Sequence, residues 1–352
     1  MMKPNLLARL MRIKKVAVIG AGTMGAGIAQ ICAQTGWETI LYDAFPEGLQ
    51  RGMSNIDAFW EKGIARGKTS TEQKLQWAAN LSPVADLAQA VKDCDLVIEA
   101  VPEIIELKQE IFREVELYCS EDTILATNTS SLSIRSIAKV MDRPERLIGM
   151  HFFNPVPIMK LLELVKHSET SDSTIEIAEA AGKAMNKTTI LVNDVPGFAT
   201  SRLGVVLGNE AIRMLADGVA SAKDIDTAMV LGYKHPMGPL ALSDLVGLDV
   251  RRDILLNLKK SFNDDAYTPH PLLEKLISEG RLGKKSGKGI YDWSSGRHTA
   301  RENCWRRYTD WRPLTGHGEH PRPECGHWNT LSSHPQSHKE RILRINPYSW
   351  SQ

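Results

Sequence analysis

A chain of 352 residues can build two domains, and its composition, with 42% hydrophobic and 24% charged residues, is that of a globular protein. The 43 basic residues nearly cancel the 42 acidic ones, so charge gives no reason to expect nucleic acid or an anionic membrane as a partner. The five cysteines form no CxxC pair, which favours a reducing compartment, and no stretch is long enough to span a membrane. We therefore expect a cytoplasmic protein.

Apolar, strand-like runs alternate with helical segments over the first part of the chain. In order, the runs are KVAVIG, ETILYD, DLVIEAV, TILAT and RLIGMHFF. Strands that alternate with helices form βαβ units, and buried parallel strands are rich in Val, Ile and Leu. Between the second and third runs, residues 44–90 are polar and mostly helical in pattern, which predicts a helical hairpin inserted in the sheet domain.

A glycine-rich turn directly follows the first strand and precedes a helix. Residues 20–25 read GAGTMG, in which the first glycine permits a tight turn, the second lets the backbone approach a pyrophosphate and the third lets helix and strand pack closely. A turn without a ligand is the alternative, but the strand, the helix and a later acid argue against it. We predict a Rossmann-type, doubly wound, mostly parallel α/β sheet over residues 1–193. Its candidate dinucleotide contacts are Gly20, Gly22, Thr23, Met24 and Gly25.

The later acid is Asp43, which closes the second strand. A carboxylate there accepts hydrogen bonds from a ribose 2′-hydroxyl and repels a 2′-phosphate, so it predicts NAD rather than NADP as the cofactor. Arg51 is near enough in sequence to weaken this preference. The alternative role for Asp43 is to cap a turn, as Asp commonly does.

His151 and Glu163 form the candidate acid–base pair. His151 ends an apolar strand, at the edge where open α/β sheets bind ligands, and alternation in KLLELV places Glu163 on the same face as Leu161 and Val165. A buried carboxylate needs a partner, for which His151 is the candidate. Either residue alone is more commonly structural, but together, downstream of the glycine-rich turn, they indicate proton transfer.

Residues 194–293 are predicted to form a smaller all-α domain. The strand-like runs stop at NDVPGF, a junction with Pro and Gly that is typical of domain boundaries. Ser221 and Asp224 form an S-x-x-D capping box before the helix DIDTAMVLG, and Gly232 is placed to end that helix. Further helices are predicted through LSDLVGLDVRRDILLNL and PLLEKLISEG.

The chain resembles the 3-hydroxyacyl-CoA dehydrogenase family, most closely its monofunctional, short-chain 3-hydroxybutyryl-CoA branch, over residues 14–293. The matching segments are VAVIGAGTMGAGIAQ, EAVPE, TNTSSLSI, HFFNPVPIMKLLELV, DVPGFATSRL, YKHPMGPLALSDLVGLDV and GKKSGKGIYDW. The resemblance implies an NAD-dependent oxidoreductase that moves a hydride between the cofactor and C3 of a short-chain 3-hydroxyacyl-CoA, giving a 3-oxoacyl-CoA reversibly.

The resemblance also implies roles for individual residues. One group provides the base, the acid that orients it, and the polar contacts to the substrate, and a second group lines the cofactor. The implied catalytic residues are His151, Glu163, Ser130, Asn154 and Ser201, and the implied cofactor-lining residues are Glu103, Lys108 and Asn128. Ser201 departs from the family pattern, since many relatives have Asn there, and the shorter side chain would either reach the site through a water or leave the site looser.

Lys62, Arg66 and Lys68 are candidates to meet the CoA phosphates, although a solvated helix face is the preferred interpretation of this run. Two other functions stay open. A dehydrogenase of a free hydroxy acid or sugar acid would share the fold and the histidine, but the segment HFFNPVPIMK argues against it. A crystallin-like or dinucleotide-sensing protein would keep the glycines without needing Ser130 and His151 together.

The helical domain is predicted to form a homodimer, because it carries more apolar positions than so small a unit buries alone. These positions are Val205, Val206, Leu207, Ile212, Leu240, Leu242, Leu245, Val246 and Leu248.

Residues 294–352 differ in character from the rest of the chain. They are rich in Arg, His, Trp and Pro, show no periodicity, and begin where the resemblance stops. We expect an irregular, disordered and dispensable tail that arose from a change of reading frame. The functional rival is a zinc module on Cys304, Cys325 and His327, which lacks the usual paired spacing.

Overall fold

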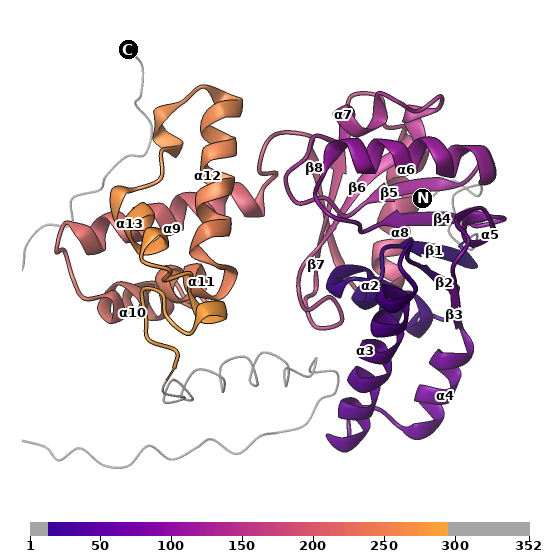
Figure 1. Cartoon of the computed structure of the whole chain (residues 1–352), viewed down its shortest axis with the longest axis horizontal. Coiled ribbons are helices and arrows are strands. Elements are labelled where there is room, and N and C mark those ends of the chain that lie inside the picture. Colours follow the sequence, from indigo (N-terminus) through magenta and orange to yellow (C-terminus); the bar gives the residue numbers. More distant parts are fainter. Residues whose placement is uncertain (1–12, 295–352) are drawn as a thin grey trace, which may run out of the picture. The chain divides into compact units, whose positions relative to one another are not determined.

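The computed structural model describes residues 13–294 (Figure 1). The expected tail and the rival zinc module lie outside this range. The first domain is built on one eight-stranded sheet with the order β3-β2-β1-β4-β5-β6-β7-β8. The strands are β1 (Lys15–Ile19), β2 (Glu38–Tyr42), β3 (Leu81–Val84), β4 (Leu96–Glu99), β5 (Ile124–Thr127), β6 (Leu147–Phe152), β7 (Leu161–Lys166) and β8 (Thr188–Asn193). Neighbours pair in parallel except β6 with β7, so the predicted mostly parallel sheet is confirmed.

Helices pack on both faces of this sheet. They are α2 (Thr23–Gln34), α3 (Pro46–Ala65), α4 (Thr71–Ala79), α5 (Leu87–Val91), α6 (Ile105–Tyr118), α7 (Ile134–Ala138), the 3-10 turn η1 (Pro144–Arg146) and α8 (Asp172–Ala184). Side chains alternate between two cores: Val16 and Val18 join the core shared with α2 and α8, whereas Ala17 and Ile19 join the core shared with α5, α6 and α7. Burial on both faces explains why the central strands are continuous apolar runs.

The predicted helical hairpin is present as α3 and α4, and residues 44–90 are mostly helical as expected, but they also contain one strand that was not predicted. Leu81–Val84 form β3, which pairs in parallel with β2 at the end of the sheet. The run LSPV has only four residues and is interrupted by Ser82 and by Pro83, a residue that strands tolerate at a sheet edge. Its pattern therefore gave no strand signal. The edge strand β8, TTILVN, was likewise not among the predicted runs.

A helical domain follows the sheet. Its elements are α9 (Thr200–Ala216), α10 (Ala222–Gly232), α11 (Pro239–Val246), α12 (Leu248–Phe262), η2 (Asp265–Tyr267), α13 (Pro271–Ser278) and η3 (Lys284–Ser286). The cap at Ser221 is confirmed, since its Oγ accepts the amide N–H of Asp224 at 3.2 Å, and α10 ends at Gly232 as predicted. LSDLVGLDVRRDILLNL forms two helices rather than one, because Gly247 has a φ of 110° and separates α11 from α12.

A buried carboxylate anchors the end of the described chain to this domain. Asp244 on α11 has no exposed surface and accepts the amide N–H of Tyr291 at 2.8 Å and the indole N–H of Trp293 at 2.9 Å. Burial raises the pKa of Asp244, although these hydrogen bonds act in the opposite direction. Residues as far as Trp293 are thus part of the packed structure. Among the helices within residues 13–294, none is long and apolar enough to cross a membrane.

Candidate active site

The glycine-rich turn lies where the strand order reverses, with β1 flanked by β2 and β4. Gly20 has a φ of 100°, and a Cβ there would come within 2.7 Å of the carbonyl oxygen of Ala100, just after β4. A Cβ at Gly25 would lie 1.7 Å from the carbonyl oxygen of Gly20. Neither position accepts a side chain, so the turn is held against the two strands at the point where open α/β sheets bind dinucleotides.

The N-terminus of α2 is open toward this turn. Its N-cap, Gly22, supplies no side-chain hydrogen bond, the first turn has no acidic residue, and nothing lies within 4 Å of the place a Cβ would take at Gly22. Thr23 is exposed, and Met24 packs partly against the core. Free N–H groups at the positive end of a helix suit an anionic pyrophosphate, so these residues fit the predicted dinucleotide.

Asp43 follows β2 and joins the same turn. One carboxylate oxygen accepts the amide N–H of Ala21 at 2.7 Å, and the other accepts the amide N–H of Phe45 at 2.9 Å. The capping role considered as an alternative is therefore present. Each oxygen keeps a further acceptor site, so the same carboxylate can receive ribose hydroxyls beside the turn. The two roles are compatible, and Asp43 fits NAD.

His151 on β6 and Glu163 on β7 are directly opposite each other in the antiparallel register. Nδ1 of His151 is 2.7 Å from Oε2 of Glu163, and the two side chains are 8% and 0% exposed. The predicted pair is thus brought together, which leaves Nε2 of His151 for another partner. The rings of Phe153 and Phe198 flank the imidazole, with centroids 4.5 Å and 5.9 Å away. This apolar setting strengthens the electrostatic interaction within the pair.

Glu163 has further partners at the start of α9 that the sequence did not indicate. Oε1 accepts the amide N–H of Thr200 at 2.9 Å and that of Ala199 at 3.2 Å, and Oε2 accepts the Thr200 hydroxyl at 2.8 Å. Burial opposes ionisation, but the hydrogen bonds from His151 and Thr200 outweigh it and hold the pKa of Glu163 below its ordinary value. A threonine beside a PGF segment has no pattern that would have identified this contact.

Ser130 lies in a loop organised by Glu103. One oxygen of Glu103 accepts the Thr129 hydroxyl at 2.6 Å and the amide N–H groups of Ser130 and Ser131 at 2.9 and 3.1 Å. Partial burial works against the charge, but these hydrogen bonds and nearby Lys108 lower the pKa of Glu103. Ser130 itself is exposed. Its backbone is therefore fixed, and its hydroxyl, which donates to Glu103 at 3.4 Å, is exposed to a ligand.

Lys108 lies beneath this loop rather than on its surface. Its side chain is 1% exposed, and Nζ is 2.6 Å from fully buried Glu99 and 3.4 Å from Glu103. Lys108 therefore supports Glu99 and Glu103 from within the domain rather than facing solvent. Glu99, at the end of β4, was not among the predicted residues of this region; its only signal was an acid within the apolar run DLVIEAV. Burial raises the pKa of Glu99, although Lys108 and Thr127 favour its ionised form.

The remaining candidates occupy separate positions. Asn128 follows β5, and its side-chain oxygen accepts the amide N–H of Phe152, next to His151, at 2.9 Å. Asn154 is exposed just after β6, and Ser201 is half-buried in the first turn of α9. Lys62, Arg66 and Lys68 are exposed, as expected for a solvated run.

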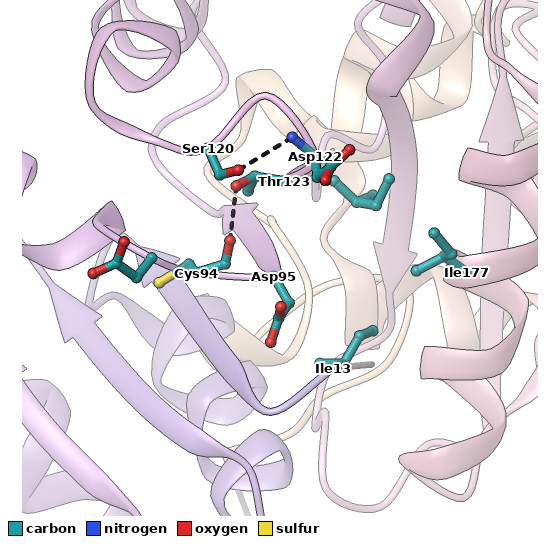
Figure 2. Close-up of a pocket in the computed structure, with 9 residues that line it drawn as sticks. Ile13, Cys94, Asp95, Ser120, Asp122, Thr123 and Ile177 are labelled. Carbon is teal, nitrogen blue, oxygen red and sulfur yellow. Dashed lines mark hydrogen bonds between the residues drawn. The ribbon is translucent and has the colours of Figure 1, made fainter. Parts of the chain in front are cut away.

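A polar cavity of about 220 Å³ lies at the opposite edge of the sheet, where β1, β4 and β5 begin (Figure 2). Its groups are engaged with the backbone: the Asp95 carboxylate accepts the amide N–H groups of Lys14 and Lys15, and the Thr123 hydroxyl donates to the carbonyl of Cys94. Among residues 13–294, no cluster of His, Cys, Asp or Glu is arranged to hold a metal ion. The candidate active site is thus the carboxyl edge with Gly20, Asp43 and His151.

A dinucleotide-binding turn and a buried His–Glu pair at the same sheet edge define a Rossmann-type dehydrogenase. Comparison with known families agrees. The 3-hydroxyacyl-CoA dehydrogenase NAD-binding domain matches residues 15–195, and the C-terminal domain of the same family matches residues 197–293. The chain therefore belongs to the 3-hydroxyacyl-CoA dehydrogenase family, and it is an NAD-dependent oxidoreductase of 3-hydroxyacyl-CoA.

Individual relatives support this assignment. The chain is 43% identical to 3-hydroxybutyryl-CoA dehydrogenase of Clostridioides difficile, over 80% of this chain and 99% of that protein. It is 40% identical to the mitochondrial hydroxyacyl-coenzyme A dehydrogenase of Homo sapiens, over 81% and 93% of the two chains. The crystal structure of (S)-3-hydroxybutyryl-CoA dehydrogenase from Ralstonia eutropha superposes with a TM-score of 0.77 and 39% identity, covering 80% of this chain and 99% of that one.

Proposed function

We propose that the chain oxidises the 3-hydroxyl group of a short-chain 3-hydroxyacyl-CoA, such as 3-hydroxybutyryl-CoA, and reduces the corresponding 3-oxoacyl-CoA in reverse. The observation that carries the proposal is the 2.7 Å contact between His151 Nδ1 and Glu163 Oε2 at the sheet edge that holds the glycine-rich turn. The names of the Clostridioides and Ralstonia relatives support the short-chain substrate.

In the proposed mechanism, NAD held at the glycine-rich turn would supply the hydride chemistry at C3 of the substrate in either direction. Gly20, Gly22 and Gly25 would hold its pyrophosphate at α2, with Thr23 and Met24 beside it, and Asp43 would accept hydrogen bonds from its ribose. His151 takes the 3-hydroxyl proton at Nε2 during oxidation and gives it back during reduction. Glu163 holds the imidazole by Nδ1 and stabilises its protonated form.

Three polar residues are proposed to orient the substrate. Ser130, on the loop fixed by Glu103, contacts the 3-oxygen, and Asn154 contacts the thioester region. Ser201 reaches the substrate through a water, because its side chain is shorter than the Asn of many relatives. Glu103 and Asn128 complete the cofactor side, with Lys108 supporting Glu103 from below. The proton transfer by His151 that these contacts support is itself worth roughly 10²- to 10⁴-fold in rate.

Initial rates test the substrate assignment. Acetoacetyl-CoA should be reduced with NADH at a higher kcat/KM than longer 3-oxoacyl-CoA thioesters, and NADPH should be used poorly in place of NADH. A free 3-oxo acid serves as the control for the CoA group. A preference for the free acid would refute the proposal and support the hydroxy-acid alternative.

We further propose that the enzyme is a homodimer that pairs through its helical domain. Four of the apolar positions from which the dimer was predicted, Val205, Ile212, Leu240 and Leu248, are buried in the core of that domain, so they cannot contribute to an interface. Other apolar side chains remain exposed and support an interface: Leu203, Val206, Leu231, Tyr233, Leu245, Val246, Val250 and Leu256. Light scattering at micromolar concentration should give the mass of two chains, and the mass of one chain would contradict the dimer.

We propose a cytoplasmic location because the described cysteines are free thiols. Among the described residues, Cys32, Cys94 and Cys119 are free thiols, as a reducing compartment allows. Burial raises the pKa of the Cys94 thiol to about 12, so this thiol is unreactive. Cell fractionation with the native chain is the test, and recovery in an organelle, as the name of the human relative indicates for that protein, would overturn this location.

A further inference from the structure

The Glu163 carboxylate has four hydrogen-bonding contacts, and three of them come from two consecutive residues. Ala199 and Thr200 donate their amide N–H groups to Oε1, and the Thr200 hydroxyl donates to Oε2. The fourth contact is His151 Nδ1, which meets the same Oε2. Glu163 and Thr200 are 37 positions apart in sequence. The contact therefore joins the start of α9 to a carboxylate on β7.

These contacts all favour the charged form of Glu163. An amide N–H or a hydroxyl bonds a carboxylate more strongly than a carboxylic acid, and α9 directs the positive end of its dipole at the group. The carboxylate is fully buried, so without such donors it would tend to become neutral. The surrounding strands add no second charge here: opposite Glu163, β6 presents His151 and β8 presents Ile190.

We propose that Thr200 is a positioning residue for the acid–base pair, whose hydroxyl and amide keep Glu163 ionised and oriented toward Nδ1 of His151. The proposal rests on the proposed catalytic role of His151. Thr200 does not touch the reacting atoms. It acts through Glu163, which can stabilise a protonated imidazole only while it carries its charge. The Thr200 hydroxyl therefore helps to set the lowest pH at which the enzyme stays active.

The test replaces the hydroxyl with a methyl group of the same size. Thr200→Val keeps the shape and the amide N–H but removes the donor to Oε2, whereas Thr200→Ser restores a hydroxyl. Thr227→Val is the matched control, because the Thr227 hydroxyl donates to the carbonyl of Lys223 within α10 and not to Glu163. All variants are compared as full chains for NADH affinity and melting temperature, so that misfolding is detected.

Two readouts separate a positioning role from a merely structural one. The titration of Glu163, followed by NMR of a ¹³C-labelled carboxyl and assigned with Glu163→Gln, should move upward by about one pH unit in Thr200→Val, the equivalent of one lost hydrogen bond. The acid limb of the kcat/KM profile should move in the same direction, and kcat at neutral pH should fall about fivefold with KM unchanged. Thr200→Ser and Thr227→Val should match the wild type.

The outcomes distinguish this inference from the proposed function. An unchanged Glu163 titration in a folded Thr200→Val protein overturns the inference, whatever His151 does. Full activity of His151→Ala overturns the proposed function, and the NMR titration then still reports whether Thr200 holds the charge of Glu163. If Thr200→Val unfolds, the titration of Thr200→Ala decides in its place, because alanine leaves the helix start intact but also lacks the hydroxyl.

Discussion

Nδ1 of His151 faces Oε2 of Glu163 across the antiparallel β6–β7 pair at 2.7 Å, so Nε2 is the imidazole nitrogen left to meet the substrate. Because this nitrogen carries the proposed proton transfer, His151→Ala is expected to lower kcat at least about 100-fold. NADH binding should persist, since the glycine turn and Asp43 are separate from the imidazole. Fluorescence titration of NADH and steady-state rates measure the two effects, and activity above a few per cent would contradict the assignment.

Glu163→Gln keeps a hydrogen-bonding group of the same size but removes the charge. We expect a loss of about 100-fold in kcat with the fold retained. In the folded enzyme the pKa of Glu163 is below its ordinary value. The ionised carboxylate therefore stabilises the fold at any pH above the ordinary pKa of a glutamate. This stabilisation is lost as the pH falls through the pKa of the folded state. Urea unfolding from neutral to acid pH should therefore depend less on pH in Glu163→Gln. An unchanged pH–rate profile would show that Glu163 does not act through its charge.

Cofactor selectivity should follow from Asp43. Replacing Asp43 by Ser and Ala44 by Arg removes the carboxylate that repels a 2′-phosphate and adds a cation that attracts it. The ratio of kcat/KM for NADPH to that for NADH should rise by at least tenfold. Total activity should fall as well, because Asp43 also accepts the amide N–H of Ala21 in the turn. Equal use of both cofactors by the wild type would remove the basis of this prediction.

Residues after Trp293 are predicted to be dispensable, because the family match ends at residue 293. Truncation after Trp293 should leave kcat and the melting temperature unchanged or improved. The matched control ends the chain at Gly289, which removes three donors to buried Asp244, from the amides of Ile290 and Tyr291 and the indole of Trp293. That control should melt several degrees lower, since an unsatisfied buried carboxylate is costly. A clear loss of activity or melting temperature in the chain that ends at Trp293 would show that the tail is needed.

Much of the sheet could be predicted because its central strands are buried on both faces and read as continuous apolar runs. The glycine turn was equally readable, since Gly20 and Gly25 sit where a Cβ would collide with backbone atoms. Strand β3 could not be predicted from the sequence, because an edge strand that contains Pro83 has neither a continuous apolar run nor a regular apolar–polar alternation.

Within the site, periodicity identified His151 and Glu163 but could not identify their supports. The contact of Thr200 with Glu163 spans 37 positions and depends on where α9 begins, which no local pattern encodes. Glu99 looked like one more position in a strand, and its pairing with Lys108 becomes evident only when both are seen to be buried. Contacts made by the tertiary fold are therefore what sequence reasoning missed.

The antiparallel turn between β6 and β7 also bears on how the site assembles. His151 and Glu163 are only 12 positions apart, whereas parallel neighbours in this sheet are joined by crossovers that include a helix. The entropy lost on closing a loop grows with the logarithm of its length, and low contact order favours early formation. The acid–base pair is therefore expected to form when strands β6 and β7 pair during folding. The start of α9 would pack later and add its hydrogen bonds to the Glu163 carboxylate.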